Sequence, residues 1–554
     1  MPGLGRLWHT MRHLRPVQLY GRVWFRLTTP RADLRPAPVV RRAAAGAWHR
    51  PVEHRMGQVS EDVFCFLNQT HALSERGWDD PGIDKLWRFN LHYFDDLTAP
   101  SSPERLEWQR ALLGRWVTEN PPARGSGWEP YPTSLRIVNW IKWALAGNEL
   151  PDECVQSLAV QARWLSRRLE SHLLGNHLFV NAKALFFAGL FFEGAEADRW
   201  RDVALRILAR EIPEQILEDG GQFELSPMYH ALALEDMLDL VNLATAHSSA
   251  LPANGAATIA YWRERIESMR RWLRIMSHPD GEISFFNDAA VGIAPAPAAL
   301  ESYAERLALG AGGAAADAVS DLEASGYVRV ACGHAVALLD TARVGPDYLP
   351  AHAHADTLSF ELALYGQRVL VNSGTSLYGG GEERLRQRGT AAHNTVVINC
   401  ENSTEVWGGF RVARRAMPIA RSVTRDEGAV VVRCAHDGYG RLSGRPRHLR
   451  RWTFSDDAMT VEDRITGGFE TAEARFHLHP SVRVASMDGS DCTRIVILHL
   501  AGGQRVSFDV EAGTLRTEET TWHPEFGRSV PALCLVVRLA GALSRIHMKW
   551  NTAA

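Results

Sequence analysis

Cysteine and long apolar runs are both scarce in this chain. Its 554 residues include only seven cysteines, which are scattered, odd in number and without a CxxC pair or zinc-finger spacing. This usage favours reduced, buried thiols over a disulfide framework. No run of eighteen apolar residues occurs, which argues against a transmembrane helix, and the first residues lack the uninterrupted apolar core of a signal peptide. The default expectation is therefore a cytoplasmic protein, with export by an unconventional route as the alternative.

Motifs of several common enzyme classes are also absent. The sequence contains no P-loop, no GxSxG serine-hydrolase elbow and no HExxH zinc helix. Its formal net charge of −3 gives no overall reason to expect a nucleic-acid partner. The composition is that of a globular protein, with 45% hydrophobic and 23% charged residues, and 554 residues are too many for one ordinary core. We therefore expect two or three domains.

Acidic residues are nearly missing from the first fifty positions, which hold ten arginines and a single acid, Asp33. Such a stretch either attracts a polyanion or an anionic membrane surface, or lies against an acidic face of its own protein. We define residues 1–55 as the basic N-terminal arm, and the sequence leaves these interpretations open.

The rest of the chain divides into two parts with different hydrophobic periods. From about residue 60 to 310, apolar residues recur at i, i+3, i+4 and i+7, which is typical of α-helices. Tryptophans in these segments are usually core residues, although in a ring of helices some would line a cleft and stack on sugar rings. The ranges predicted as helices are 104–119, 134–146, 155–169, 177–193, 197–217, 229–246 and 257–277.

A Gly/Ala-rich stretch at 309–318 indicates a domain boundary, and the period after it changes to two. Many short alternating segments separated by turn residues predict a β-sandwich. The fold class is therefore multidomain α+β, with a helical domain over residues 56–315 and an antiparallel β domain over 316–554. The predicted strands include 327–331, 335–340, 358–365, 368–372, 395–399, 429–433, 459–463, 494–499, 505–510 and 532–537.

Three polar residues at alternate positions, His352, His354 and Asp356, form the most informative group in the sequence. In an extended segment all three would point to one face of a sheet, at the start of a β-hairpin. Burying such a group without partners would be costly, so it needs a metal, a substrate or internal hydrogen bonds. The segment by itself fits a proton-transfer or metal site and a structural histidine cluster equally well.

Two helix starts in the first domain also carry polar side chains. Asn176 and His177 follow Gly175, where free N–H groups and the helix dipole favour a bound anion, although an N-cap and a core histidine are the plainer interpretation. Glu224 and Tyr229 lie near the start of a later helix. A tyrosine there is usually a core residue, and the functional alternative is proton exchange with a leaving oxygen.

Two further segments complete the set. Residues 127–140 combine aromatic rings, an arginine and an amide, which fits a carbohydrate cleft that meets a carboxylate and equally a well-packed helix start. In the β domain, His393 follows Arg384 and Arg388, and it could converge with Asn372 and the histidine group from adjacent strands.

Six motifs, in this order, resemble the heparinase II/III family of polysaccharide lyases over roughly residues 80 to 420. They are LWRFNLHYFD (86–95), NH (176–177) followed by NAKAL, ExSPxYH (224–230), FND (286–288), HxHxD (352–356) and AHNT (392–395). The resemblance implies an incomplete (α/α) toroid followed by an antiparallel β-sandwich, in agreement with the change of period near residue 315.

The activity implied by the resemblance is β-elimination, which cuts a glycosidic bond on the C4 side of a uronic acid and leaves an unsaturated sugar. Carried over, Asn176 and His177 meet the uronate carboxylate, while Tyr229 and His352 transfer the protons. No cofactor is required for this chemistry. The candidates for substrate binding are Trp128, Tyr131, Arg136, Asn139, Glu224, Asn287, Tyr378, Arg384 and Arg388.

The resemblance also implies a structural zinc in the sandwich, held at positions matching His354, Asn372 and His393. Asn372 stands where the family has an Asp, and a neutral amide is a much poorer zinc ligand than a carboxylate. The sequence therefore favours a hydrogen-bonded cluster over a metal.

The expected partner is an acidic polysaccharide, with heparan sulfate, hyaluronan, chondroitin, alginate and bacterial exopolysaccharides all open. The lack of an export signal resembles family versions associated with exopolysaccharide or capsule production. One alternative is a catalytically inactive glycan-binding or assembly protein of an exopolysaccharide system. Another is a glycoside hydrolase, which needs two opposed carboxylates, and only Glu129, Glu224 and Asp288 are candidates for them.

Overall fold

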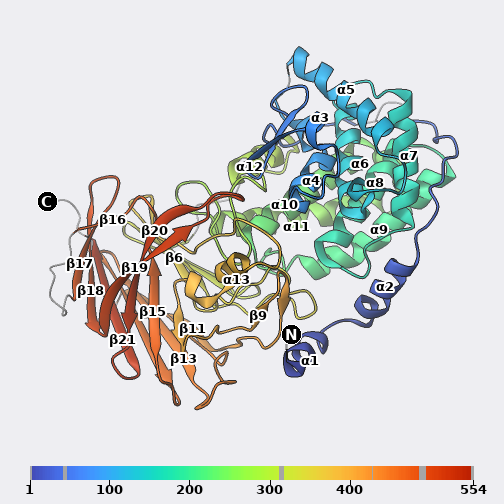
Figure 1. Cartoon of the computed structure of the whole chain (residues 1–554). Coiled ribbons are helices and arrows are strands. Elements are labelled where there is room, and N and C mark those ends of the chain that lie inside the picture. Colours follow the sequence, from blue (N-terminus) through green and yellow to red (C-terminus); the bar gives the residue numbers. More distant parts are fainter. Residues whose placement is uncertain are drawn as a thin grey trace.

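The computed structural model describes residues 3–41, 46–100, 102–310, 317–426, 428–485 and 494–550. Helices dominate as far as Arg306, and antiparallel strands follow from Val319 onward (Figure 1). This order confirms the predicted fold class. Residues 311–316 of the predicted boundary, Arg42 and Cys492 lie outside the described residues.

The helical domain is built from amphipathic helices around one that is buried on all sides. The buried residues of α8 run almost without interruption from Leu178 to Phe191, so this helix lies at the centre of the domain. All seven predicted helices are present, with ends shifted by about one turn at most. The helices after the arm are α3 (Leu73–Arg76), α4 (Lys85–Tyr93), α5 (Pro103–Glu119), α6 (Pro130–Leu145), α7 (Asp152–Ser166), α8 (Gly175–Phe191), α9 (Ala195–Gln215), α10 (Pro227–Ala246), α11 (Gly255–Ile275) and α12 (Pro297–Arg306).

A β-hairpin interrupts the part of the chain that was predicted to be helical. Strand β1 (Val63–Phe66) pairs antiparallel with β2 (Gln69–Ala72). The two-residue loop between them, Leu67 and Asn68, has positive φ at both positions, as a type I′ hairpin turn requires. Strands of four residues are too short to show a period of their own.

The β domain contains an eight-stranded, a five-stranded and a four-stranded sheet, all with antiparallel neighbours. One apolar core joins them, because Leu362 of the five-stranded sheet, Phe476 of the four-stranded sheet and Trp452 of the eight-stranded sheet share it. The eight-stranded sheet has the order β11-β12-β13-β14-β21-β18-β17-β16, the five-stranded β3-β4-β5-β6-β7 and the four-stranded β19-β20-β15-β8. The elements are β3 (Val319–Leu322), β4 (Tyr327–Cys332), β5 (Ala335–Asp340), β6 (Phe360–Leu364), β7 (Gln367–Leu370), α13 (Glu382–Arg388), β8 (Val396–Ile398), β9 (Val406–Trp407), β10 (Arg411–Val412), β11 (Pro418–Asp426), β12 (Ala429–His436), β13 (Arg447–Ser455), β14 (Ala458–Thr466), β15 (Ala472–His477), β16 (Arg483–Val484), β17 (Ile495–His499), β18 (Arg505–Ala512), β19 (Thr514–Trp522), β20 (Val530–Arg538) and β21 (Leu543–Trp550).

The basic N-terminal arm contacts both domains. Its helices are α1 (Leu4–Met11) and α2 (Pro16–Leu27). Thr10 accepts a hydrogen bond from Trp407 Nε1 of the β domain at 3.1 Å, and Arg15 forms an ion pair with Glu214 of α9. Part of the arm therefore does lie on acidic groups of its own protein.

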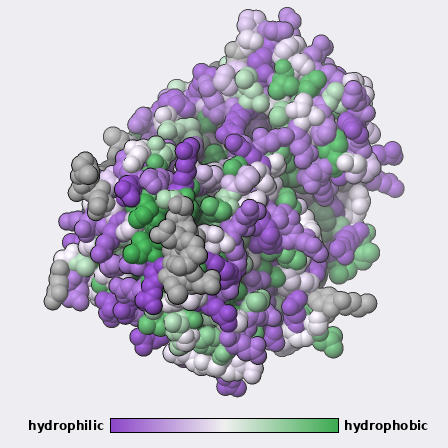
Figure 2. Space-filling view, turned by 60° about the vertical axis from the view of Figure 1, so that its left-hand side comes forward, coloured by the Kyte–Doolittle hydropathy of each residue, from purple (hydrophilic) through white to green (hydrophobic). Residues whose placement is uncertain are grey.

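One face of the whole molecule is largely hydrophilic, with apolar residues in separate patches (Figure 2). No helix within the described ranges has the length and apolarity to cross a bilayer.

Candidate active site

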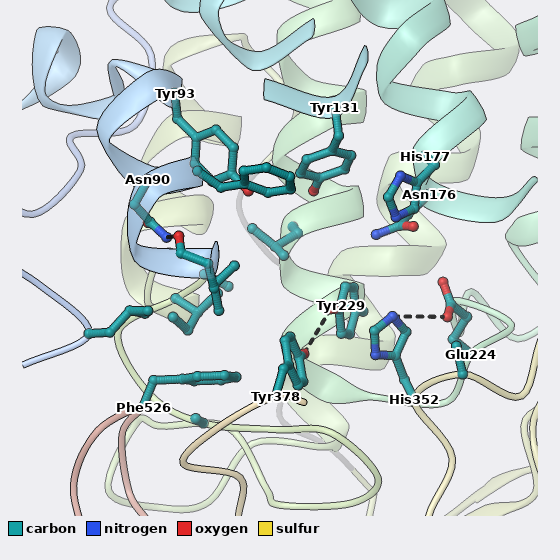
Figure 3. Close-up of a pocket in the computed structure, with 18 of the residues that line it drawn as sticks. Asn90, Tyr93, Tyr131, Asn176, His177, Glu224, Tyr229, His352, Tyr378 and Phe526 are labelled. Carbon is teal, nitrogen blue, oxygen red and sulfur yellow. Dashed lines mark hydrogen bonds and ion pairs between the residues drawn. The ribbon is translucent and has the colours of Figure 1, made fainter. Parts of the chain in front are cut away.

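A cleft of about 1120 Å³ is lined by residues of the arm, the helical domain and the loops of the β domain. All four residues predicted to be catalytic line it, together with three of the predicted substrate-binding residues. Asn176 and His177 lie on one wall, across from His352 and Glu224 (Figure 3). The cleft-lining residues that were predicted are Tyr131, Asn176, His177, Glu224, Tyr229, His352 and Tyr378.

Tyr229 is held in place by the start of α10. Pro227 begins this helix, and Ser226 caps it by accepting a hydrogen bond from the Tyr229 backbone N–H at 3.2 Å. The Tyr229 ring lies against the His352 ring, with centroids 4.0 Å apart, and its hydroxyl is 2.8 Å from the Tyr378 hydroxyl. Burial raises the pKa of Tyr229 well above 10, so the phenol carries its proton at neutral pH.

His352 lies in a loop, and the prediction that residues 352–356 are part of a strand is wrong. Strand β6 begins only at Phe360, and Leu358 adopts a positive φ that breaks the extended run. The two histidines still point the same way, because His352 Nδ1 and His354 Nε2 each lie 2.8 Å from a carboxylate oxygen of Asp288. Hydrogen bonding to one buried acid, rather than a strand period, brings them together.

Asp288 sets the orientation of the His352 ring. Burial alone would raise the pKa of Asp288, but the Arg384 guanidinium and the two histidines hold it well below its usual value. An ionised carboxylate only accepts hydrogen bonds, so His352 donates from Nδ1 and keeps Nε2 as an acceptor. That nitrogen lies 3.7 Å from Glu224 Oε2, and burial raises the pKa of Glu224.

On the opposite wall, His177 forms an ion pair with Glu170, with 3.1 Å between Nδ1 and Oε1. Burial alone would lower the pKa of His177, but the Glu170 carboxylate outweighs it and raises this pKa above 6.5. Asn181 fixes Glu170, since its amide nitrogen donates to Oε2 at 3.1 Å. The ring of Tyr131 lies 4.7 Å from that of His177, centroid to centroid. This wall therefore offers a cation beside the amide of Asn176.

Three predicted substrate-binding residues of the helical domain do not line the cleft. Trp128 is 3% exposed and donates to a backbone carbonyl. Arg136 is completely buried, stacks over the Trp116 ring at 3.7 Å and donates to Gln161. Asn139 donates to Asp95 at 2.6 Å. The assignment of these three residues to substrate binding is wrong, because the same composition serves a packed helix start.

The predicted substrate-binding residues Asn287, Arg384 and Arg388 are also buried. Asn287 accepts a hydrogen bond from the His354 backbone N–H at 3.0 Å, and Arg388 donates to Ala353 O at 2.7 Å. Arg384 is bonded to both oxygens of Asp288. These side chains position the histidine loop and Asp288, and none of them lines the cleft.

Several residues that form the site were not predicted. Asp288 was named only within the FND motif and as a candidate hydrolase carboxylate, and Glu170 was not named. Nothing in their local sequence identifies His352 and His177 as their partners. Asn90 and Tyr93 line the cleft and belong to the motif at residues 86–95. That motif was a usable signal for them, whereas the aromatic residues Phe410 and Phe526 of the β domain had none.

The residues matched to the zinc site are close together but fit a zinc ion poorly. His354 Nδ1 lies 3.2 Å from His393 Nε2, and His393 Nδ1 lies 3.2 Å from Asn372 Oδ1. His354 also uses Nε2 for Asp288. Among the described residues, no three His, Cys, Asp or Glu side chains are grouped so that they could hold a metal ion. Two imidazoles and a neutral amide fall short of the donor set that zinc sites use.

Comparisons with known proteins agree with this arrangement. Residues 107–306 match the model of the heparinase II/III N-terminus, and residues 315–550 match that of the heparinase II/III-like C-terminal domain. A heparin-sulfate lyase of Bacteroides stercoris is 29% identical over 250 residues, which cover 41% of this chain and 36% of that protein. The chain thus matches little more than a third of that relative.

A second relative is covered more completely. The FtsZ-localized protein C of Caulobacter vibrioides is 25% identical over 450 residues, covering 74% of this chain and 72% of that protein. Among solved structures, a crystal structure of heparinase III has a TM-score of 0.65 at 19% identity, covering 85% of this chain and 77% of that one. This likeness shows a shared fold. With both of its domains matched in order, the chain belongs to the heparinase II/III family.

Proposed function

We propose that this protein is a polysaccharide lyase that cleaves a uronic-acid-containing acidic polysaccharide by β-elimination. The observation that carries the proposal is the contact of Tyr229 with His352, which places a protonated phenol beside an imidazole. Asp288 bonds Nδ1 of this imidazole and so leaves Nε2 as the proton acceptor. Across the cleft, Asn176 and His177 supply an amide and a cation. A proton acceptor, a proton donor and a carboxylate-binding wall are what this elimination requires.

The chemistry assigns a role to each group. Removal of the C5 proton builds negative charge on the uronate carboxylate, and the Asn176 amide with cationic His177 stabilises it. Each such donor contributes about 3 kcal/mol by analogy with an oxyanion hole. His352 Nε2 is an acceptor for the C5 proton, and Tyr229, which carries its proton, protonates the leaving O4. Positioned acid–base groups of this kind contribute ~10²–10⁴-fold in rate.

A glycosaminoglycan is the substrate class that we place first. The relative in Bacteroides stercoris carries the name heparin-sulfate lyase. Alginate and bacterial exopolysaccharides are the further candidates, since any uronate offers the same C5 proton and carboxylate. We propose no cofactor for the reaction, because the groups that it needs are side chains of the cleft.

The two alternative functions have less support in the site. A glycoside hydrolase would need two free carboxylates facing each other. Asp288 is fully buried in its ion pair, and Glu129 does not line the cleft and pairs with Lys85. In a catalytically inactive glycan-binding protein Asp288 would serve only as the partner of Arg384, and the contact of Tyr229 with His352 would have no chemical role.

A panel of uronate polymers tests the proposal. Heparan sulfate, hyaluronan, chondroitin, alginate and acidic bacterial exopolysaccharides are incubated with the full chain, and ultraviolet absorbance of the unsaturated product is followed. We expect absorbance to rise with at least one polymer. New reducing ends without this absorbance would instead indicate hydrolysis, and binding without either product would indicate the inactive glycan-binding alternative.

Substrate binding should weaken as the pH rises through the raised pKa of His177. The cationic form is favoured in the folded protein, so its contribution is complete below pH 6.5 and is lost above the raised pKa. Glu170→Gln removes the main stabilising charge, and we expect KM to begin rising at a lower pH than in the wild type. Glu129→Gln, which removes a weaker influence on the same histidine, should shift the profile less. Identical KM profiles for the wild type and Glu170→Gln would contradict the role of His177.

We also propose that His354, Asn372 and His393 form a hydrogen-bonded cluster without a metal. Elemental analysis of the purified protein should therefore find far less than one zinc per chain. Asn372→Asp restores the carboxylate that zinc sites use, and we expect this variant to acquire zinc when it is expressed in zinc-supplemented medium. A stoichiometric zinc in the wild type would refute the metal-free cluster.

A further inference from the structure

The outer faces of α1 and α2 carry an unusual number of exposed apolar side chains. Ten of the sixteen large apolar residues that are exposed in the described structure lie between Leu4 and Val39. On α1 they follow the spacing i, i+4, i+7, and on α2 the spacing i, i+4, i+8 with two neighbours, so each set lies on one helix face. The exposed fractions are Leu4 87%, Trp8 66%, Met11 50%, Leu19 45%, Tyr20 65%, Val23 58%, Trp24 69% and Leu27 79%.

The opposite faces of the same helices are already occupied by the protein. Gln18 is 1% exposed and donates to Tyr348 O at 3.0 Å. Phe25 packs against His172 with ring centroids 4.3 Å apart, and Arg168 lies over its ring. Thr10, Leu14 and Gln18 line the cleft. The helices are thus docked through one face, and at the edge of the molecule (Figure 1) their apolar outer faces have no cover among the described residues.

Positive charge surrounds these apolar faces. No acidic residue precedes Asp33 in the sequence. Four exposed arginines of this stretch do not line the cleft, and no carboxylate in the described ranges lies within 4.0 Å of any of them. They are Arg6, Arg12, Arg26 and Arg31. A helix that lies in the interface of an anionic membrane typically carries tryptophan and leucine on one face and arginine along the edges of that face.

We propose that α1 and α2 dock the chain onto the surface of an anionic phospholipid bilayer. Helices of 8 and 12 residues are about 12 and 18 Å long, too short to span a bilayer, so they lie along its surface. The aliphatic side chains of Leu4, Met11 and Leu27 reach the acyl boundary, and the arginines reach the lipid phosphates. A second copy of the chain is a poor occupant, because a symmetric contact would oppose two faces of the same charge. The proposal does not depend on the lyase activity.

Vesicle flotation of the full chain tests the proposal. We expect the protein to float with vesicles of phosphatidylglycerol and phosphatidylcholine in equal parts, to float far less with phosphatidylcholine alone, and to be released by high salt. Arg12→Ser with Arg26→Ser should lower the partition coefficient roughly 25-fold, at about fivefold per charge. Trp8→Ser with Trp24→Ser should lower it about tenfold or more, because both rings leave the interface.

Matched substitutions elsewhere serve as controls. Ile495 of β17 is 54% exposed, so Ile495→Ser removes an exposed apolar side chain outside the arm. Arg199 and Arg206 of α9 are exposed, so Arg199→Ser with Arg206→Ser removes two positive charges outside the arm. Both should bind vesicles within about twofold of the wild type, and circular dichroism should show all variants folded. Absence of flotation at low salt overturns the proposal. The proposal is also overturned if the tryptophan double variant floats as well as the wild type and soluble heparin abolishes flotation. That result would identify a general polyanion site. A change from dimer to monomer in the tryptophan pair without any vesicle binding would assign the face to self-association and equally overturn it.

Discussion

Replacement of Tyr229 by phenylalanine is expected to lower kcat by about 10²–10⁴-fold while KM stays near its wild-type value. The substitution removes one hydroxyl from a half-buried ring and leaves the packing on His352 unchanged, so the loss reports proton transfer and not folding. The measurement is the initial rate of ultraviolet absorbance on whichever polymer the panel identifies, with substrate affinity measured separately by calorimetry.

Tyr348→Phe is the matched control. Tyr348 also lines the cleft, but its hydroxyl donates to Glu214 at 2.8 Å. We expect its kcat to stay within a few-fold of the wild type. Tyr378→Phe, which removes the partner of the Tyr229 hydroxyl, should have an intermediate effect. A Tyr229→Phe enzyme with nearly normal kcat would show that another group donates the proton.

Asp288→Asn is expected to impair both stability and catalysis. Arg384 is completely buried, and loss of the carboxylate leaves its charge uncompensated, at a cost of about 3–5 kcal/mol in the free energy of unfolding. The amide also no longer forces His352 to donate from Nδ1. Where a histidine acts as general base, losing such an orienting carboxylate lowers kcat on the order of 10⁴-fold.

Two measurements separate the effects of Asp288→Asn. Chemical unfolding gives the stability change, with Asp198→Asn as the control, because Asp198 pairs with Arg201 but its side chain is 47% exposed. That control should change stability by less than about 1 kcal/mol. Nitrogen-15 shifts of the His352 ring report its tautomer in protein that is still folded. If the tautomer and kcat of Asp288→Asn both match the wild type, Asp288 does not orient His352.

Elements with a clear apolar period were predictable from the sequence. The helices α5 to α11 and strands such as β5 and β18 were predicted at or near their observed ends. Strand β13 was not, because two of its buried positions are His448 and Arg450. Both bond to Asp463 on β14. The buried positions of this strand therefore hold charged and polar side chains, and a search for alternating apolar residues does not detect it.

Residue types and motif order predicted the candidate catalytic residues better than the candidate substrate-binding residues. Asn176, His177, Tyr229 and His352 belong to separate motifs, and all of them line one cleft. The arginines Arg136, Arg384 and Arg388 were assigned to an acidic substrate by charge alone. Whether an arginine meets a ligand or a buried partner depends on what packs around it, and that cannot be inferred from the residues beside it in the chain.

The sequence by itself determined the two-part architecture, the family and the residues that approach the cleft, because periodicity and motifs are local properties of the chain. Only the tertiary structure decided which carboxylate orients which histidine. Asp288 is 64 positions from His352 and 96 positions from Arg384 in the sequence. Glu170 contacts His177 only because the chain folds so that the start of α8 lies beside it. Such pairs arise when burial removes water from charged groups and leaves them only one another as partners, and burial is a property of the assembled fold.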